Sequence, residues 1–143
     1  MAAEQVEASV SLVNGKVRFT GKAGANPPVT MDYRPPLGDG QGYTGLELLL
    51  LSLATCSGTS VVTLLRKMRK DVSGFQVNAK GLRREKHPTS FEKITLEFTL
   101  HSSDAQEANL REALRLSEES ICPVWAMLKP AVEIVSECRV LPR

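Results

Sequence analysis

The uncharged apolar stretch Leu48–Leu65 constrains the fold of this chain more than any other feature of its sequence. Its eighteen residues carry no charge and reach the length of a segment that can span a lipid bilayer. The part from Thr55 to Ser60, however, contains hydroxyl groups, a cysteine and a glycine, and is too polar for the middle of an isolated membrane span. We therefore expect a helix that is buried inside a soluble protein or at a dimer interface.

This helix is expected to run from near Thr44 to about Arg69. Thr44 is followed three residues later by Glu47, which is the spacing of a capping box. Its first half is apolar on nearly all sides, as in a buried helix. The densest basic run of the chain lies at its far end, where the helix dipole favours cations: Arg66, Lys67, Arg69 and Lys70. We interpret that run as a solvated helix end rather than a contact for a polyanion.

The remaining elements follow from periodicity. Alternating residues predict two strands joined at Asn14-Gly15 and a third strand over Val29–Tyr33, before a glycine-rich loop. After the long helix, alternation predicts two more strands around Phe75–Ala79 and Ile94–Leu100. A helix, a short helix over Pro123–Leu128 and a last strand over Val132–Leu141 complete the order βββαββααβ. The expected fold is a single α+β domain over residues 1–143.

The helix that follows the fifth strand has its own start signal. Ser103 and Gln106 have the spacing of a second capping box. One apolar stripe is expected along this helix: Leu110, Ala113, Leu114 and Ile121.

Composition excludes several classes of protein. The net charge is only +2 and charged residues make up 24% of the chain, so the sequence has no electrostatic signature of nucleic-acid binding. Residues Met1–Val10 carry acids and lack the features of a secretory signal. We expect a cytoplasmic protein with reduced thiols and with neither a nucleic acid nor a membrane as partner.

The three cysteines are far apart and include no CxxC pair, so neither a zinc site nor a disulfide scaffold is expected. Cys138 alternates with charged residues on the last strand, and we assign it to the core without chemistry. Cys56, taken alone, has the pattern of a small core residue of a helix. Cys122 directly precedes Pro123, a residue favoured at the first position of a helix. Cys122 is thus expected at a helix N-terminus, where a thiolate is stabilised, although such a junction is also an ordinary chain break.

The combination of these features resembles the OsmC/Ohr family. The resemblance rests on the glycine-rich loop, the apolar helix with Cys56 in its middle, and Ile121-Cys122-Pro123-Val124 after an amphipathic helix. In the Ohr branch, a glutamate stands ten residues before the cysteine, at the position of Leu46 here. Glu47 better matches the second acid of OsmC-type members, so the chain is closer to the OsmC-like branch than to Ohr itself.

The resemblance implies a peroxidase that reduces organic hydroperoxides. Cys56 would attack the peroxide, Cys122 would resolve the oxidised sulfur, and an external thiol or dithiol would reduce the resulting disulfide. It also implies an arginine and a glutamate near the first cysteine, for which Arg34 and Glu47 are the candidates. Arg18 is a rival of Arg34, because the arginine of the Ohr branch lies nearer the N-terminus.

The resemblance further implies an intertwined homodimer, with no metal and no organic cofactor. The alternative function is a dimeric ligand-binding or redox-sensing module of the same fold with little turnover. Four apolar residues are candidates for favouring an organic peroxide, each of them also explicable as core: Leu49, Leu53, Trp125 and Met127. His87 and His101 have no ligand-like spacing and are expected at the surface.

Overall fold

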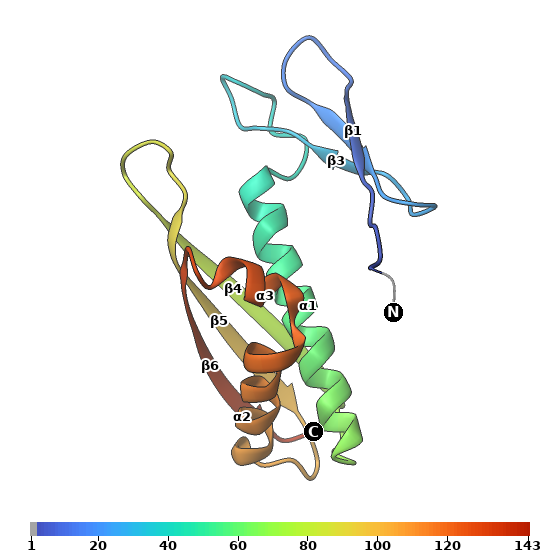
Figure 1. The fold of residues 1–143 in the computed structure, drawn as a ribbon, viewed down its shortest axis with the longest axis vertical. Coiled ribbons are helices and arrows are strands. Elements are labelled where there is room, and N and C mark those ends of the chain that lie inside the picture. The colour runs from blue at the N-terminus through green and yellow to red at the C-terminus, as the bar shows by residue number, and fades with distance from the viewer. Residues whose placement is uncertain (1–2) are drawn as a thin grey trace. The chain divides into compact units, whose positions relative to one another are not determined.

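The computed structural model describes residues 3–143; residues 1–2, which begin the expected single domain, lie outside the described part. Within these residues the element order is β1β2β3α1β4β5α2η1α3β6, where η1 is a single π-helical turn (Figure 1). This order matches the predicted βββαββααβ, and the fold class is α+β as expected. Contacts divide the chain into two compact units, one ending at Leu49 and the other running from Leu50 to Arg143.

The first unit contains a three-stranded antiparallel sheet of β1 (Ser9–Leu12), β2 (Phe19–Lys22) and β3 (Val29–Met31), with β2 in the middle. The carboxamide of Asn14 organises the turn between β1 and β2, because its Oδ1 accepts the backbone N–H groups of Lys16 and Arg18, both at 3.0 Å. The predicted turn is therefore present, but it is wider than a two-residue hairpin. The apolar side chains of β1 remain exposed.

Helix α1 (Gly45–Lys67) begins with the predicted capping box. The Thr44 N–H donates to Glu47 Oε1 at 2.8 Å, and the Glu47 N–H donates to Thr44 Oγ1 at 3.2 Å. The helix ends two residues earlier than predicted. Arg69 adopts a left-handed conformation with φ of 60°, and the Lys70 N–H closes the end on the Leu65 carbonyl at 3.0 Å.

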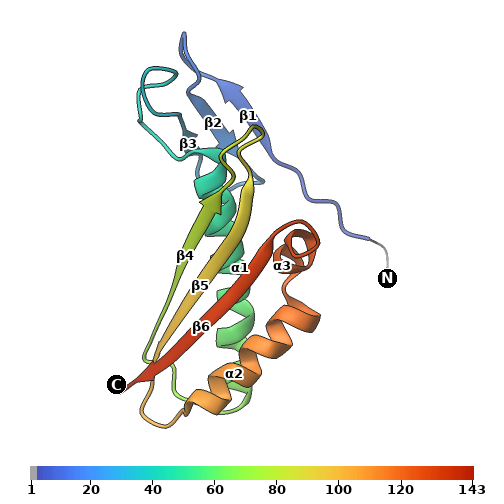
Figure 2. The same ribbon diagram turned by 90° about the vertical axis from the view of Figure 1, so that its left-hand side faces the viewer.

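The second unit contains a sheet of β4 (Gly74–Arg83), β5 (Phe91–His101) and β6 (Glu133–Leu141), with β5 in the middle. β4 pairs with β5 in antiparallel fashion, and β6 pairs with β5 in parallel, as a β–α–β crossover requires (Figure 2). Helix α2 (Glu107–Leu116) forms this crossover together with η1 (Ser117–Ile121) and α3 (Pro123–Leu128).

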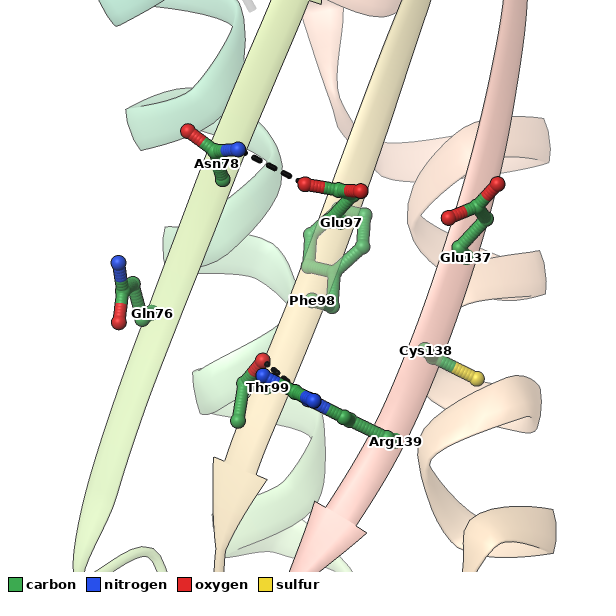
Figure 3. Close-up of a pocket in the computed structure, with 8 residues that line it drawn as sticks. All are labelled: Gln76, Asn78, Glu97, Phe98, Thr99, Glu137, Cys138 and Arg139. Atoms are coloured by element: carbon green, nitrogen blue, oxygen red, sulfur yellow. Dashed lines mark hydrogen bonds between the residues drawn. The ribbon is translucent and has the colours of Figure 1, made fainter.

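The core of this unit lies on one face of the sheet, which α1 and α2 cover; the other face is open (Figure 3). Buried side chains of the sheet and the helices fill it: Leu53, Val61, Leu65, Ile94, Leu96, Phe98, Leu100, Leu110, Ala113, Leu114 and Trp125. Gly58 faces β4, because a Cβ atom there would lie 3.5 Å from side-chain atoms of both Phe75 and Val77.

The structure bears on two expectations about the helices, and one of them is wrong. Helix α1 is long and apolar enough to cross a membrane, but it packs one side on the sheet, and only 39% of its most apolar window is buried. Within one chain α1 is therefore buried on the side that faces the sheet, and burial of its other side at a dimer interface stays a prediction. The second capping box was predicted at Ser103 and Gln106, and that position is wrong. Helix α2 begins at Glu107, and the Gln106 N–H donates to Asn109 Oδ1 at 2.8 Å.

Candidate active site

Cys56 lies in the middle of α1 and its side chain is half-buried. The next two residues, Ser57 and Gly58, are buried against the sheet. Because Thr55 is exposed and Ser57 is buried, Cys56 lies at the border between the packed and the exposed sides of the helix. A thiol in this position is neither a simple core residue nor a freely exposed one.

Cys122 is the N-cap of α3, as the Cys-Pro junction predicts. Pro123 occupies the first turn, and the Trp125 N–H points to Cys122 Sγ with an N···S distance of 3.5 Å. The backbone of Cys122 is fully used, since its N–H donates to the Ser117 carbonyl at 2.9 Å and its carbonyl accepts from Ala126 at 3.1 Å. Its side chain is only 2% exposed, so this helix terminus is inside the protein.

The tertiary structure brings the two thiols into contact. Burial raises the pKa of Cys122 to about 11, and the Cys56 thiol adds to this by hydrogen bonding and by charge repulsion. The N–H groups of Trp125 and Val124 act in the opposite direction, as expected at a helix N-terminus, but burial outweighs them.

The expectation that Cys122 ionises more readily than an ordinary cysteine is therefore wrong. The sequence correctly places the sulfur at a helix terminus. It does not reveal that the terminus is buried, and the loss of solvation of a thiolate exceeds the stabilisation from two N–H groups. Cys122 is a protonated thiol at neutral pH.

Glu47 and Arg34 form the second pair of predicted site residues, and both belong to the first unit. Hydrogen bonds from the backbone and side chain of Thr44 lower the pKa of Glu47; burial opposes this, and the charge of Arg34 lowers the pKa further. The guanidinium of exposed Arg34 lies 5.6 Å from the centre of the Tyr33 ring. The structure therefore places Glu47 in its capping box and within the electrostatic reach of Arg34.

Arg18, the rival arginine, is engaged elsewhere in the first unit. Its Nε lies 3.4 Å from Asp32 Oδ2 and its Nη2 lies 3.3 Å from Asp39 Oδ2. The Asp32 side chain is fully buried; burial alone would raise its pKa, but backbone N–H groups of Gln41, Tyr33 and Asp39 together with Arg18 lower it. Asp32 thus holds the glycine-rich loop together, a role that the sequence analysis missed.

Cys138 is half-buried on β6, so the core position that was expected is only partly enclosed. Burial raises the pKa of the Cys138 thiol; the charge of Arg111 on α2 lowers this pKa, and the charge of Glu107 raises it.

A polar depression of about 520 Å³ lies on the open face of the sheet, and Cys138 is one of the residues that border it (Figure 3). Asn78 and Glu97 pair with each other there at 2.7 Å, as do Arg139 and Thr99 at 3.2 Å. This depression contains neither Cys56 nor Cys122.

The remaining candidate residues differ in how deeply they are buried. Leu53 and Trp125 are core residues, whereas Met127 is 70% exposed. His87 lies in the loop after β4 and His101 at the end of β5, both exposed as predicted. In residues 3–143, no three His, Cys, Asp or Glu side chains cluster in a way that could hold a metal ion.

The sequence did not predict two buried hydroxyl groups near the cysteine pair. Ser57 Oγ and Ser117 Oγ, each next to or near one of the paired cysteines in the chain, are buried without a hydrogen-bond partner. No sequence signal distinguishes them from ordinary helical serines.

The chain is similar to known proteins over nearly its full length. The family model described as OsmC-like protein matches residues 38–137. Protein YhfA of Escherichia coli K12 is 32% identical over 136 residues, which cover 95% of this chain and 98% of YhfA.

Solved structures share the fold. A hypothetical protein from Aquifex aeolicus VF5 is 31% identical, with a TM-score of 0.87 and 99% coverage of both chains. An organic hydroperoxide resistance protein, OsmC from Legionella pneumophila, is 12% identical, with a TM-score of 0.73 and coverage of 98% of this chain and all of that one. At that identity, the likeness to the Legionella protein concerns the fold alone.

Proposed function

Because the chain belongs to the OsmC-like family, we propose that it is a thiol-dependent peroxidase that reduces organic hydroperoxides through Cys56 and Cys122. The family includes proteins associated with hydroperoxide resistance. The observation that carries the proposal is the contact between the Cys56 and Cys122 thiols, which come from distant parts of the sequence. Two thiols in contact are the arrangement that a peroxide-driven disulfide requires.

In the proposed first step, the Cys56 thiolate attacks one oxygen of the hydroperoxide. An S–O bond forms, the O–O bond breaks, and the alcohol leaves after taking up a proton, so that Cys56 becomes a sulfenic acid. In the second step the Cys122 sulfur attacks Cys56. The S–S bond forms, the S–O bond breaks, and water leaves with the proton of Cys122. An external thiol or dithiol then reduces the disulfide by exchange.

The environments of the two thiols support this order of roles. Cys56 is half-buried, so a peroxide can reach it, whereas Cys122 is almost completely buried. A protonated Cys122 can donate a hydrogen bond to a Cys56 thiolate. Cys122 attacks only after losing its proton. Because burial disfavours the thiolate, the second step, in which Cys122 attacks the oxidised Cys56, is the one that the buried site slows.

We assign Arg34 and Glu47 to activation of the peroxide. A guanidinium stabilises thiolate and donates hydrogen bonds to a peroxide oxygen, and a carboxylate nearby orients it. The electrostatic interaction between Arg34 and Glu47 supports this pairing, and the engagement of Arg18 by Asp32 and Asp39 argues against the rival.

A second copy of this chain is the proposed partner. Along α1 and β4, the second unit has an open groove of about 490 Å³, whose lining includes Leu51, Ala54, Val62, Phe75 and Val77 together with three threonines and Arg66. Leu51 is 49% exposed there, and in the first unit Val10 and Leu12 of β1 are more than half exposed. A homodimer that covers these surfaces would complete the burial that the sequence of α1 predicts.

We further propose a cytoplasmic location, where reducing thiols are available and no structural disulfide is needed. The alternative, a redox-sensing module with little turnover, is favoured by one observation: the raised pKa of Cys122, which slows resolution. A steady-state assay with an external dithiol distinguishes the two, because a sensor would oxidise once and an enzyme would turn over many times.

The test of the proposal is peptide mapping after one equivalent of cumene or tert-butyl hydroperoxide. We expect a Cys56–Cys122 disulfide with Cys138 still free, and the same result in the matched control Cys138→Ser. Cys122→Ser should stop at the sulfenic acid or over-oxidise. If Cys56 stays reduced under excess hydroperoxide, the chain is not a peroxidase.

A further inference from the structure

The turn that leads into Cys122 is not α-helical. Residues Ser117–Ile121 form a π turn between α2 and α3. It is closed by the bond from the Cys122 N–H to the Ser117 carbonyl at 2.9 Å, which spans five residues instead of the four of an α-helix. One extra residue is therefore accommodated in this turn.

The extra residue changes which side chain continues the buried stripe of α2. Leu110, Ala113, Leu114 and Ser117 are all buried, at the spacing of an α-helical face. In an α-helix, the next residue on this face would be Ile121, four residues after Ser117. In the π turn the face passes instead to Cys122. The exposures agree, since Ile121 is 47% exposed and Cys122 only 2%.

This change of register determines which side chain contacts Cys56. With α-helical spacing through residue 121, the isoleucine would point inward and the cysteine would be rotated by about 100° around the axis. The side chain in contact with Cys56 would then have no redox chemistry. With the π turn, it is a thiol.

The position where the turn begins is also not optimised for stability. Ser117 is fully buried, and its hydroxyl has no hydrogen-bond partner. A buried polar group without a partner destabilises a fold, and such groups call for an explanation other than packing. π turns themselves occur frequently at functional sites.

We propose that the Ser117–Ile121 π turn is the positioning element of the cysteine pair, which selects Cys122 in place of Ile121 to face Cys56. This inference rests on the proposed function for its purpose, but its geometry is testable without a peroxide. It makes the turn, and not only the Cys-Pro junction, a determinant of the site.

The test is disulfide trapping in a Cys138→Ser background. The oxidant is diamide, which takes two electrons and two protons from two thiols, so that an S–S bond forms and the diazene is reduced to a hydrazine. One protein keeps Cys56 and Cys122; the comparison protein carries Ile121→Cys with Cys122→Ser. Since about half of the Ile121 side chain is exposed, its replacement is not expected to disturb folding, which circular dichroism checks. A third protein with Ser120→Cys and Cys122→Ser sets the background for an exposed position.

We expect the native pair to cross-link at least about 10-fold faster than the residue 121 protein, and the latter to match the background. Equal rates at positions 121 and 122 would overturn the proposal, because the turn would then not select a register. Failure of the native pair to cross-link with diamide would overturn it as well. If diamide links Cys56 to Cys122 but hydroperoxides do not, the positioning role stands and the peroxidase function fails.

Discussion

The thiols of Cys56 and Cys122 interact directly, although the two residues are 66 positions apart in the chain. The pair is asymmetric, since Cys56 is half-buried and Cys122 is 2% exposed. Burial is the largest cause of the high pKa of Cys122, and the neighbouring thiol is a further cause.

The reactivity of Cys122 should keep rising with pH beyond the range of an ordinary cysteine. Its pKa is raised to about 11, against ~8.5 for an unperturbed thiol, so roughly one molecule in 10⁴ carries the thiolate at pH 7. In Cys138→Ser protein, the alkylation rate at Cys122, followed by peptide mass spectrometry, should increase up to about pH 11.

Adding Cys56→Ser provides the control. It removes the neighbouring thiol but leaves burial in place, so the apparent pKa of Cys122 should fall and still exceed ~8.5. A value at or below ~8.5 in this variant would mean that the helix terminus, and not burial, governs the thiol.

Arg34→Ala should slow hydroperoxide reduction by about 10²-fold, the typical effect of removing one charge-stabilising donor. Its side chain is exposed, so the melting temperature should change little. Arg18→Ala should lower the melting temperature, because the buried Asp32 carboxylate loses the cation that pairs with it. It should leave the rate of hydroperoxide reduction nearly unchanged. If Arg18→Ala reduces the rate without affecting stability, and Arg34→Ala does not reduce it, the arginine is misassigned.

Glu47→Gln should separate the structural from the chemical role of this residue. Glutamine also serves in a capping box, so the bond from the Thr44 N–H can be kept, while the charge beside Arg34 is lost. We expect a slower peroxidase with nearly unchanged stability. The matched variant Thr44→Ala should lower the free energy of unfolding by about 1 kcal/mol and leave the rate per folded molecule intact. If Glu47→Gln and Thr44→Ala lose the same stability and have the same peroxidase rate, Glu47 acts only as a helix cap.

Leu51→Lys should weaken the proposed homodimer, because it introduces a charge on the exposed side of α1. Sedimentation velocity should detect monomer in this variant and dimer in the native protein. Glu92→Lys, which changes the charge of an exposed residue on β5, is the control and should stay dimeric. A monomeric native protein would refute the proposed partner directly.

Local signals in the sequence determined the order of elements and several of their ends. The capping box of Thr44 and Glu47, the helix start at Pro123 and the alternation along β5 each depend on neighbours within a few residues. Such features form wherever those residues occur, so they are readable without knowledge of the packing. The identity of Cys56 and Cys122 as the candidate pair also came from the sequence, through the family resemblance.

Only the tertiary structure decided how the site is arranged. The extra residue of the π turn moves Ile121 out of the buried stripe and Cys122 into it, and a helical periodicity cannot anticipate such an insertion. Arg18 pairs with the buried carboxylate of Asp32, a contact between the residue before β2 and the residue after β3. The pKa of Cys122 was mispredicted for the same reason. A helix terminus is encoded locally, whereas the solvation of a thiolate depends on everything packed around it.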